Sequence, residues 1–172
     1  KRIPKPNGKE RVLHAVTGRM KTLQEKTYER LSENYKPTSR AKGFVKGEST
    51  ITHAMQHRNK KLIITFDIED FFPSITFSRV FGLFQNHPFN FNKQISTMLS
   101  QICCMENGKN GPIAQGAITS PYVSNMICRK LDSRLYGIAK EMRMNYSRYA
   151  DDMTFSSNKH IDNKDQKSAA PP

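Results

Sequence analysis

The chain has 172 residues, and its 28 lysines and arginines outnumber its 15 aspartates and glutamates, so the formal net charge is +13. This length excludes a large multidomain enzyme, and basic residues spread along the whole chain favour a polyanionic partner, of which nucleic acid is the commonest. No apolar run approaches the roughly 20 residues that cross a bilayer, and the three cysteines lack the spacing of a zinc site or a disulfide framework, so we expect a soluble cytoplasmic protein.

The chain is predicted to open with a basic hairpin and an amphipathic helix. Asn7-Gly8 is a turn sequence between two short runs within residues 3–13. After Gly18, apolar and small residues recur at helical spacing. The residues of this stripe are Met20, Leu23, Thr27 and Leu31.

A glycine-punctuated loop over residues 43–47 leads to a second predicted helix, from about Ser49 to Arg58. His53 and His57 share one face of that helix, and their spacing would suit two zinc ligands. No third ligand or glutamate stands beside them, so we prefer helix packing or contact with RNA.

Residues 62–68 are apolar and β-rich throughout, which predicts a strand buried on both faces. Asp67 lies near the end of this run. A carboxylate at the end of a buried strand is a candidate catalytic residue.

Three further helices are predicted from apolar residues at helical spacing. The third of them is the longest, and it begins at Ser120-Pro121, where serine provides a cap and proline suits the first turn. The stripes are Phe77, Val80, Phe81 and Phe84 in the first helix, Ile95, Met98, Leu99 and Ile102 in the second, and Val123, Met126, Ile127, Leu131, Leu135, Ile138 and Met142 in the third.

The chain then returns to strand periodicity. Residues 144–149 and 153–156 alternate like two strands of a hairpin, which would place Asp151 and Asp152 at its tip. Helices mixed with strands of this kind predict an α+β fold, an antiparallel sheet with helices on one face.

Asp67, Asp151 and Asp152 are far apart in sequence, but adjacent antiparallel strands could bring them together. Three neighbouring carboxylates repel one another and need a cation. Hard oxygen ligands favour Mg²⁺, and two such ions can stabilise the attacking and leaving oxygens of phosphoryl transfer. An adjacent pair of aspartates is by itself weak evidence, because most such pairs are solvated turn residues.

Three longer motifs strengthen this interpretation, because together they resemble the palm motifs of reverse transcriptases. The basic hairpin and the loop at residues 43–47 are also similar to finger motifs of that family, so the resemblance covers about residues 2–158. In chain order the three motifs are Phe66-Asp67-Ile68-Glu69-Asp70-Phe71-Phe72-Pro73-Ser74-Ile75, Gln115-Gly116-Ala117-Ile118-Thr119-Ser120-Pro121 and Tyr149-Ala150-Asp151-Asp152.

Within the family, the motif sequences look most like those of retron enzymes and their bacterial defence relatives. Group II intron and abortive-infection enzymes are the alternatives. The resemblance includes Arg79-Val80, Ser124-Asn125 and Leu131-Asp132. Retron enzymes typically carry an Asn-Ala-x-x-His element, and His53-Ala54-Met55-Gln56-His57 matches it except that histidine replaces asparagine.

The resemblance implies a right-hand polymerase fold without its thumb. Residues 1–60 would be the fingers region, 61–158 the palm, and 159–172 a polar tail that is disordered or non-native. Because the thumb holds primer and template, we expect the isolated chain to be weakly active or inactive.

Site residues follow from the motif positions. Asp67, Asp151 and Asp152 would be catalytic, and with the backbone carbonyl of Ile68 they would hold two Mg²⁺ ions. Tyr149 and Ala150 would lie at the primer and template. The nucleotide-binding set would be Lys5, Lys9, Arg11, Asp70, Phe71, Phe72, Gln115 and Gly116.

Within that set, Arg11 would grip the triphosphate, Phe72 would exclude a ribose 2′-hydroxyl, and Gln115 with Gly116 would line the nascent base pair. The alternatives are a solvated hairpin charge, a core aromatic residue and a plain turn.

The implied function is RNA-directed DNA synthesis on a structured noncoding RNA, in antiviral defence. The partners would be that RNA, the nascent DNA, deoxynucleoside triphosphates and an effector protein, with no membrane. Two other functions remain open: a non-catalytic nucleic-acid-binding palm in a defence complex, and an RNA polymerase or template-independent transferase on the same palm.

Overall fold

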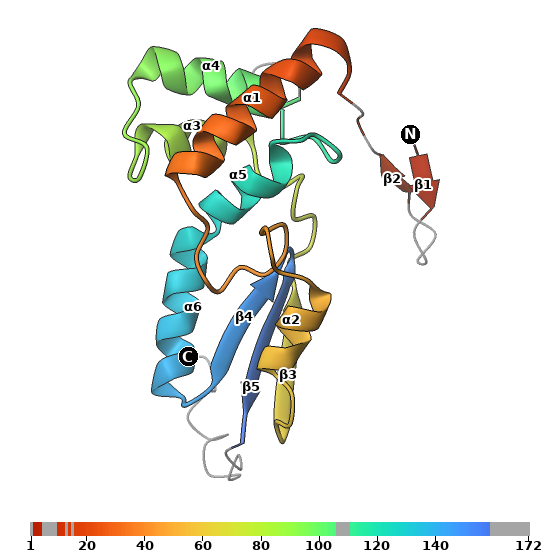
Figure 1. Ribbon diagram of the computed structural model, residues 1–172, viewed down its shortest axis with the longest axis vertical. Coiled ribbons are helices and arrows are strands. Elements are labelled where there is room, and N and C mark those ends of the chain that lie inside the picture. The colour runs from red at the N-terminus through yellow and green to blue at the C-terminus, as the bar shows by residue number, and fades with distance from the viewer. Residues whose placement is uncertain (1, 5–9, 13, 15, 106–110, 159–172) are drawn as a thin grey trace, which may run out of the picture.

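The computed structural model describes residues 2–4, 10–12, 14, 16–105 and 111–158, and for residues 2–4 and 10–12 it describes the backbone alone. Figure 1 shows a group of helices at one end of the long axis and a sheet flanked by helices at the other.

The predicted N-terminal hairpin is present. Strands β1 (Arg2–Pro4) and β2 (Glu10–Val12) pair antiparallel. Lys5 and Lys9 lie outside the described residues. Arg11 lies in β2, and in Figure 1 this hairpin stands apart from the rest of the chain.

Helix α1 (Gly18–Asn34) confirms half of the predicted stripe, because Thr27 and Leu31 are buried. Met20 and Leu23 of the predicted stripe are 44% and 43% exposed. Gln24 is buried instead, because its side-chain amide donates to the carbonyl of Ile102 at 2.7 Å. The buried residues of α1 are Gln24, Thr27 and Leu31.

Helix α2 (Thr50–Gln56) confirms the second predicted helix, and its start is fixed by a capping box. The Ser49 hydroxyl accepts from the backbone N–H of Thr52, and the Thr52 hydroxyl accepts from the N–H of Ser49. This exchange satisfies two backbone donors that the first turn would otherwise leave unpaired.

The sheet contains β3 (Leu62–Asp67), β4 (Asn145–Tyr149) and β5 (Asp152–Ser157), in the order β3-β5-β4 with antiparallel pairing throughout. The two strands of the predicted C-terminal hairpin are therefore confirmed. Ala150 and Asp151 lie in the turn between them, whereas Asp152, which was predicted to lie there too, is the first residue of β5.

The prediction that β3 is buried on both faces is wrong. Ile63 and Phe66 are each 53% exposed. The physical reason is its place in the sheet, because β3 is an edge strand while α2 and α6 pack against β4.

Helices cover both faces of β4, so the predicted packing on a single face is also wrong. Ser147 contacts His53 of α2, whereas its neighbours Tyr146 and Arg148 contact Asp132 of α6. Successive side chains of a strand point to opposite faces, so α2 and α6 must lie on opposite sides of β4.

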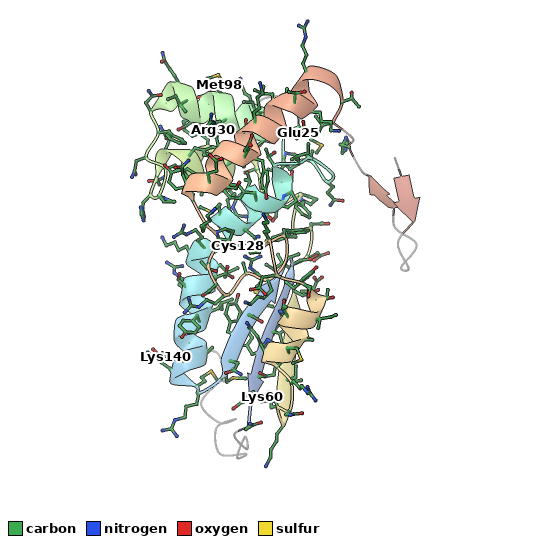
Figure 2. All side chains as sticks on the ribbon, in the orientation of Figure 1. Glu25, Arg30, Lys60, Met98, Cys128 and Lys140 are labelled. Carbon is green, nitrogen blue, oxygen red and sulfur yellow. The ribbon has the colours of Figure 1, made fainter. Side chains whose placement is uncertain are left out.

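Helices α3 (Phe77–Gln85) and α4 (Lys93–Cys103) form part of the helical end. Val80 and Phe84 of α3 are fully buried, as predicted. The stripe predicted for α4 is partly wrong, because Ile95 is 39% and Met98 is 56% exposed. Figure 2 labels Met98 on the outer side of α4. The residues that α4 buries are Ser96, Ser100, Ile102 and Cys103.

The long helix predicted from Ser120 is in fact two helices, α5 (Ser120–Ile127) and α6 (Arg129–Glu141). They meet at Cys128, which Figure 2 labels at the junction. This break turns α6 along β4 while α5 stays in the helical end (Figure 1). The apolar spacing continues across the break, so periodicity alone could not reveal it.

The core lies at the helical end. There Phe84, Phe89 and Phe91 pack with ring centroids 5.2–6.4 Å apart. The α+β class is confirmed, whereas the division into fingers (1–60), palm (61–158) and tail (159–172) and the missing thumb stay predictions. Within the described residues, no helix is both long and apolar enough to cross a membrane.

Candidate functional site

The structure brings the three predicted carboxylates to one end of the sheet. Asp67 is the last residue of β3, and Asp152, its partner across the strands, is the first residue of β5. Asp151 lies in the turn before β5, and its carbonyl accepts from the N–H of Ile68 at 3.2 Å. Directly paired residues of an antiparallel sheet place their side chains on the same face.

Electrostatics confirm that these acids are neighbours. Partial burial and the negative charges of Asp151 and Asp67 raise the pKa of Asp152, although the nearby His53 opposes the shift. Because the negative charges of the neighbouring acids disfavour ionisation of Asp152, a bound cation would stabilise this site.

The turn that carries Asp151 has an unusual backbone. Ala150 has a φ of +56°, in the left-handed region that alanine seldom adopts. The backbone at Gly43 runs against this turn, so closely that a Cβ at Gly43 would come within 2.4 Å of the Ala150 nitrogen. Only glycine permits that approach.

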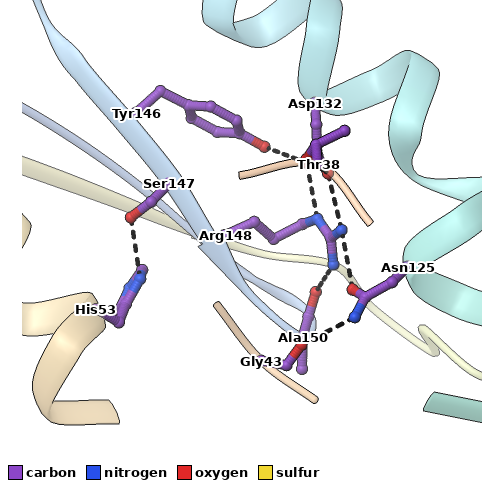
Figure 3. Close-up of polar contacts among 9 residues, drawn as sticks. All are labelled: Thr38, Gly43, His53, Asn125, Asp132, Tyr146, Ser147, Arg148 and Ala150. Atoms are coloured by element: carbon purple, nitrogen blue, oxygen red, sulfur yellow. Dashed lines mark hydrogen bonds and ion pairs between the residues drawn. The ribbon is translucent and has the colours of Figure 1, made fainter. Parts of the chain in front are cut away.

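A buried polar network lies beneath the turn (Figure 3). The guanidinium of Arg148 donates to both carboxylate oxygens of Asp132 at 2.8 and 2.9 Å, and both side chains are fully buried. It also donates to the carbonyl of Ala150 at 2.7 Å and to the side-chain oxygen of Asn125 at 3.2 Å.

The carboxylate of Asp132 is saturated with donors. Besides Arg148, it accepts from the Tyr146 hydroxyl at 2.9 Å and from the Thr38 hydroxyl at 3.2 Å. Burial and the charge of Asp132 raise the pKa of Tyr146, which keeps the phenol a donor. Burial by itself lowers the pKa of Arg148, but the hydrogen bond to Asp132 and the surrounding Cys128, Asp132 and Tyr146 side chains together outweigh that effect, and the overall shift is upward.

This network has no counterpart in the predicted site. Asn125 and Asp132 belong to the short motifs that resemble retron enzymes, and this resemblance was the only feature of the sequence that singled them out. The residues around Arg148 predict an ordinary polar strand residue. They do not indicate that Asp132, 16 positions earlier in the chain, will neutralise its charge.

The two histidines of α2 pack against the sheet, as the preferred interpretation expected. His57 is 4% exposed, and its ring nitrogens lie 2.7 Å from the hydroxyls of Ser147 and Ser156. Burial, with the charges of His53 and Lys60, lowers the pKa of His57 to about 4. Burial also lowers the pKa of His53.

His53 connects α2 to the hairpin of β4 and β5. Its ring nitrogens lie 3.0 Å from the Ser147 hydroxyl and 3.2 Å from that of Thr154. Its ring centroid is 5.8 Å from that of Tyr149.

Phe71 and Phe72, the aromatic residues of the predicted nucleotide site, follow Asp67 in a turn instead of a strand. Asp70 has a φ of +47°, and its carbonyl accepts from the N–H of Ser74 at 2.8 Å. Phe71 is buried, whereas Phe72 is half-buried, with its ring centroid 6.2 Å from that of Phe44. Phe72 therefore keeps part of its side chain accessible.

The second motif forms a turn before α5. The carbonyl of Gln115 accepts from the N–H of His14 at 2.8 Å. Gly116 has a φ of +100°, and a Cβ there would meet the carbonyl oxygen of His14 at 3.2 Å. This turn therefore contacts the segment that leads from the N-terminal hairpin. Arg11 lies in β2 of that hairpin, which stands apart from the sheet in Figure 1.

The acids fit Mg²⁺ in ligand type. In the described part of the chain no three His, Cys, Asp or Glu side chains close around one point as a finished metal site. The register that pairs Asp67 with Asp152, and the raised pKa of Asp152, nevertheless show that carboxylate residues are neighbours at this end of the sheet. These are the ligands that Mg²⁺ prefers.

A family model described as "Reverse transcriptase (RNA-dependent DNA polymerase)" matches residues 3–168. The chain belongs to the reverse transcriptase family. The match includes the carboxylate hairpin, the Phe71-Phe72 turn and the Gln115-Gly116 turn.

Curated relatives narrow this assignment. Retron Ec86 reverse transcriptase of Escherichia coli is 36% identical over 151 residues, which cover 88% of this chain and 45% of that protein. Retron Mx162 reverse transcriptase of Myxococcus xanthus is 35% identical over 184 residues, covering 99% and 38%. Retron Mx65 reverse transcriptase of the same organism is 34% identical over 170 residues, covering 90% and 39%. The retron-type assignment is therefore confirmed, and the chain spans less than half the length of these relatives.

Proposed function

We propose that the full-length gene product is a retron-type RNA-directed DNA polymerase, which extends DNA on a structured noncoding RNA and serves antiviral defence. The observation that carries this proposal is the convergence of Asp67 and Asp152 as cross-strand partners beside the Asp151 turn. Deoxynucleoside triphosphates are its substrates, and an effector protein is a proposed partner.

Two Mg²⁺ ions, when bound, would stabilise the attacking and leaving oxygens of nucleotidyl transfer. Asp67 and Asp151 would ligate both ions, the carbonyl of Ile68 would complete the triphosphate side, and Asp152 would support the site. No covalent nucleophile is needed, because positioning and charge neutralisation supply most of the rate in phosphoryl transfer.

The residues around the acids orient the nucleotide. Backbone N–H groups of Asp70 and Phe71 face the triphosphate, and the ring of Phe72 blocks a ribose 2′-hydroxyl. The half-buried state of Phe72 beside the fully packed Phe71 supports this division. Arg11, with Lys5 and Lys9, would grip the triphosphate.

The second motif and the hairpin contact the nucleic acid. Gln115 and Gly116 line the nascent base pair, and the glycine lets the template approach the backbone. Tyr149 rests near the primer end, and the small Ala150 leaves that place open. The contact of His53 with Tyr149 supports the idea that α2 fixes this ring.

The test is extension of a DNA primer on RNA by the full-length gene product in Mg²⁺. Asp67→Asn and Asp151→Asn should each lower the rate by at least about a hundredfold, because each removes a metal ligand. Glu141→Gln, an exposed acid at the end of α6, is the matched control and should leave it unchanged. Nucleic acid bound without extension would support the non-catalytic binding module instead.

A further inference from the structure

The catalytic turn depends on contacts that the chemistry itself does not use. Ala150 is held in the left-handed region, and non-glycine residues stay there only where their surroundings enforce it. Two groups hold it: Arg148 Nη1 donates to its carbonyl at 2.7 Å, and the backbone at Gly43 presses against its nitrogen.

The second of these contacts belongs to the same network as the first. Asn125 donates from its side-chain nitrogen to the carbonyl of Gly43 at 2.9 Å and accepts from Arg148 at 3.2 Å. The backbone of Arg148 also exchanges bonds with the neighbouring segment: its carbonyl accepts from Lys42 at 2.7 Å, and its N–H donates to the carbonyl of Arg40 at 2.9 Å. Figure 3 shows Asn125, Gly43 and Ala150 on one side of the guanidinium.

Asp132 fixes the guanidinium. A two-pronged pairing between Arg and a carboxylate sets the plane of the guanidinium as well as its position. Because the carboxylate also accepts from Tyr146 of β4 and from Thr38 in the loop after α1, it is itself held in place. The guanidinium can therefore present Nη1 to Ala150 in one geometry only.

We propose that the buried pair Asp132–Arg148, with Asn125, is a positioning device that sets the backbone of the Ala150-Asp151 turn and thereby the place of the Asp151 carboxylate relative to Asp67. The inference rests on the proposed polymerase function for its purpose. Its geometry extends from Ala150 through Asp151, whose carbonyl then bonds to Ile68 at the end of β3. Asp132 and Arg148 touch no substrate and act through this turn.

The alternative is that the pair merely stabilises the fold. Buried ion pairs can often be replaced by apolar residues with little loss of stability, whereas removal of one partner is costly. A variant that carries D132L, Y146F and R148M removes the charges and the phenol together. It should melt within about 5 °C of the wild type, because no charge is left unpaired.

Two properties of the full-length gene product are measured. Mn²⁺ affinity is measured by electron paramagnetic resonance, and hydrogen exchange of residues 144–153 is measured in the metal-free protein. In the triple variant we expect Mn²⁺ to bind about tenfold more weakly and the turn amides to exchange faster, as for other residues that orient metal ligands from behind. Neither readout requires polymerisation, so a failure of the proposed function would not affect it.

Phe84→Leu is the matched control, because Phe84 is fully buried in the core of the helical end and belongs to neither the network nor the turn. It should lower the melting temperature and leave Mn²⁺ affinity unchanged. A triple variant with wild-type Mn²⁺ affinity and exchange would overturn the proposal. If that variant does not fold, Arg148→Lys keeps the charge but loses the fork, and unchanged Mn²⁺ binding there would overturn it equally.

Discussion

His57 should make the stability of this fold depend on pH. The ring is 4% exposed and is surrounded by two serine hydroxyls, and burial lowers its pKa from 6.5 to about 4. The folded state therefore favours the neutral ring. Between these two pKa values the unfolded chain binds more protons than the folded one, so stability is fully present above pH 6.5 and falls as the pH drops towards 4.

The size of the effect follows from the shift. Each pKa unit corresponds to about 1.4 kcal/mol, so the full difference would be about 3 kcal/mol, and water at the surface of α2 should reduce it to about 2 kcal/mol. His57→Gln keeps a neutral polar side chain at every pH. It should cost about 1 kcal/mol at pH 7, because the serine contacts are imperfectly replaced.

Urea unfolding at a series of pH values checks this prediction. From pH 7 down to about pH 4.5 the wild type should lose about 2 kcal/mol more than His57→Gln, with carboxylate protonation common to both. His53 adds a smaller contribution of the same sign in both proteins. Parallel pH profiles for the two proteins would refute the reasoning.

Three other predictions concern the hairpin and its supports. Gly43→Ala should lower the free energy of unfolding by more than about 1 kcal/mol and impair primer extension, because its Cβ would meet the Ala150 nitrogen. In Gly137→Ala of α6 the new Cβ meets nothing, and this variant should be more stable by about 0.5–1 kcal/mol. Chemical denaturation that ranks the two variants the other way would contradict this. Asp152→Asn should raise the melting temperature without metal, since it relieves repulsion from Asp67 and Asp151, and should reduce the gain on adding Mg²⁺; thermal scans with and without Mg²⁺ decide, and an unchanged gain would argue against a metal role for Asp152. Ser49→Ala should cost about 1 kcal/mol by removing half of the α2 capping box, and an unchanged urea midpoint would show that the cap is not limiting.

Local chemistry in the sequence accounts for much of the site. Strand alternation around Ala150-Asp151 predicted the hairpin and placed both aspartates at its tip, because period-2 patterning and turn position are properties of neighbouring residues. The same reasoning located Asp67 at the end of a strand, and the register of β3 with β5 pairs it with Asp152.

What failed depended on distant partners. The edge position of β3 follows from strand order, which hydrophobicity does not encode, so Ile63 and Phe66 were wrongly predicted to be buried. Apolar spacing continues through Cys128 and hid the break between α5 and α6. The buried Arg148 looked polar, because burial of a charge is set by the residue that pairs with it.

The retron-type polymerase is tested most directly by the nucleic acid that copurifies with the full-length protein from its native host. The resemblance implies DNA joined to RNA through the 2′-hydroxyl of a branching guanosine. We predict that sequencing and debranching will find such a junction with the wild type and none with Asp151→Ala. DNA without the junction would contradict retron-type priming, and the absence of DNA from both proteins would contradict the polymerase itself.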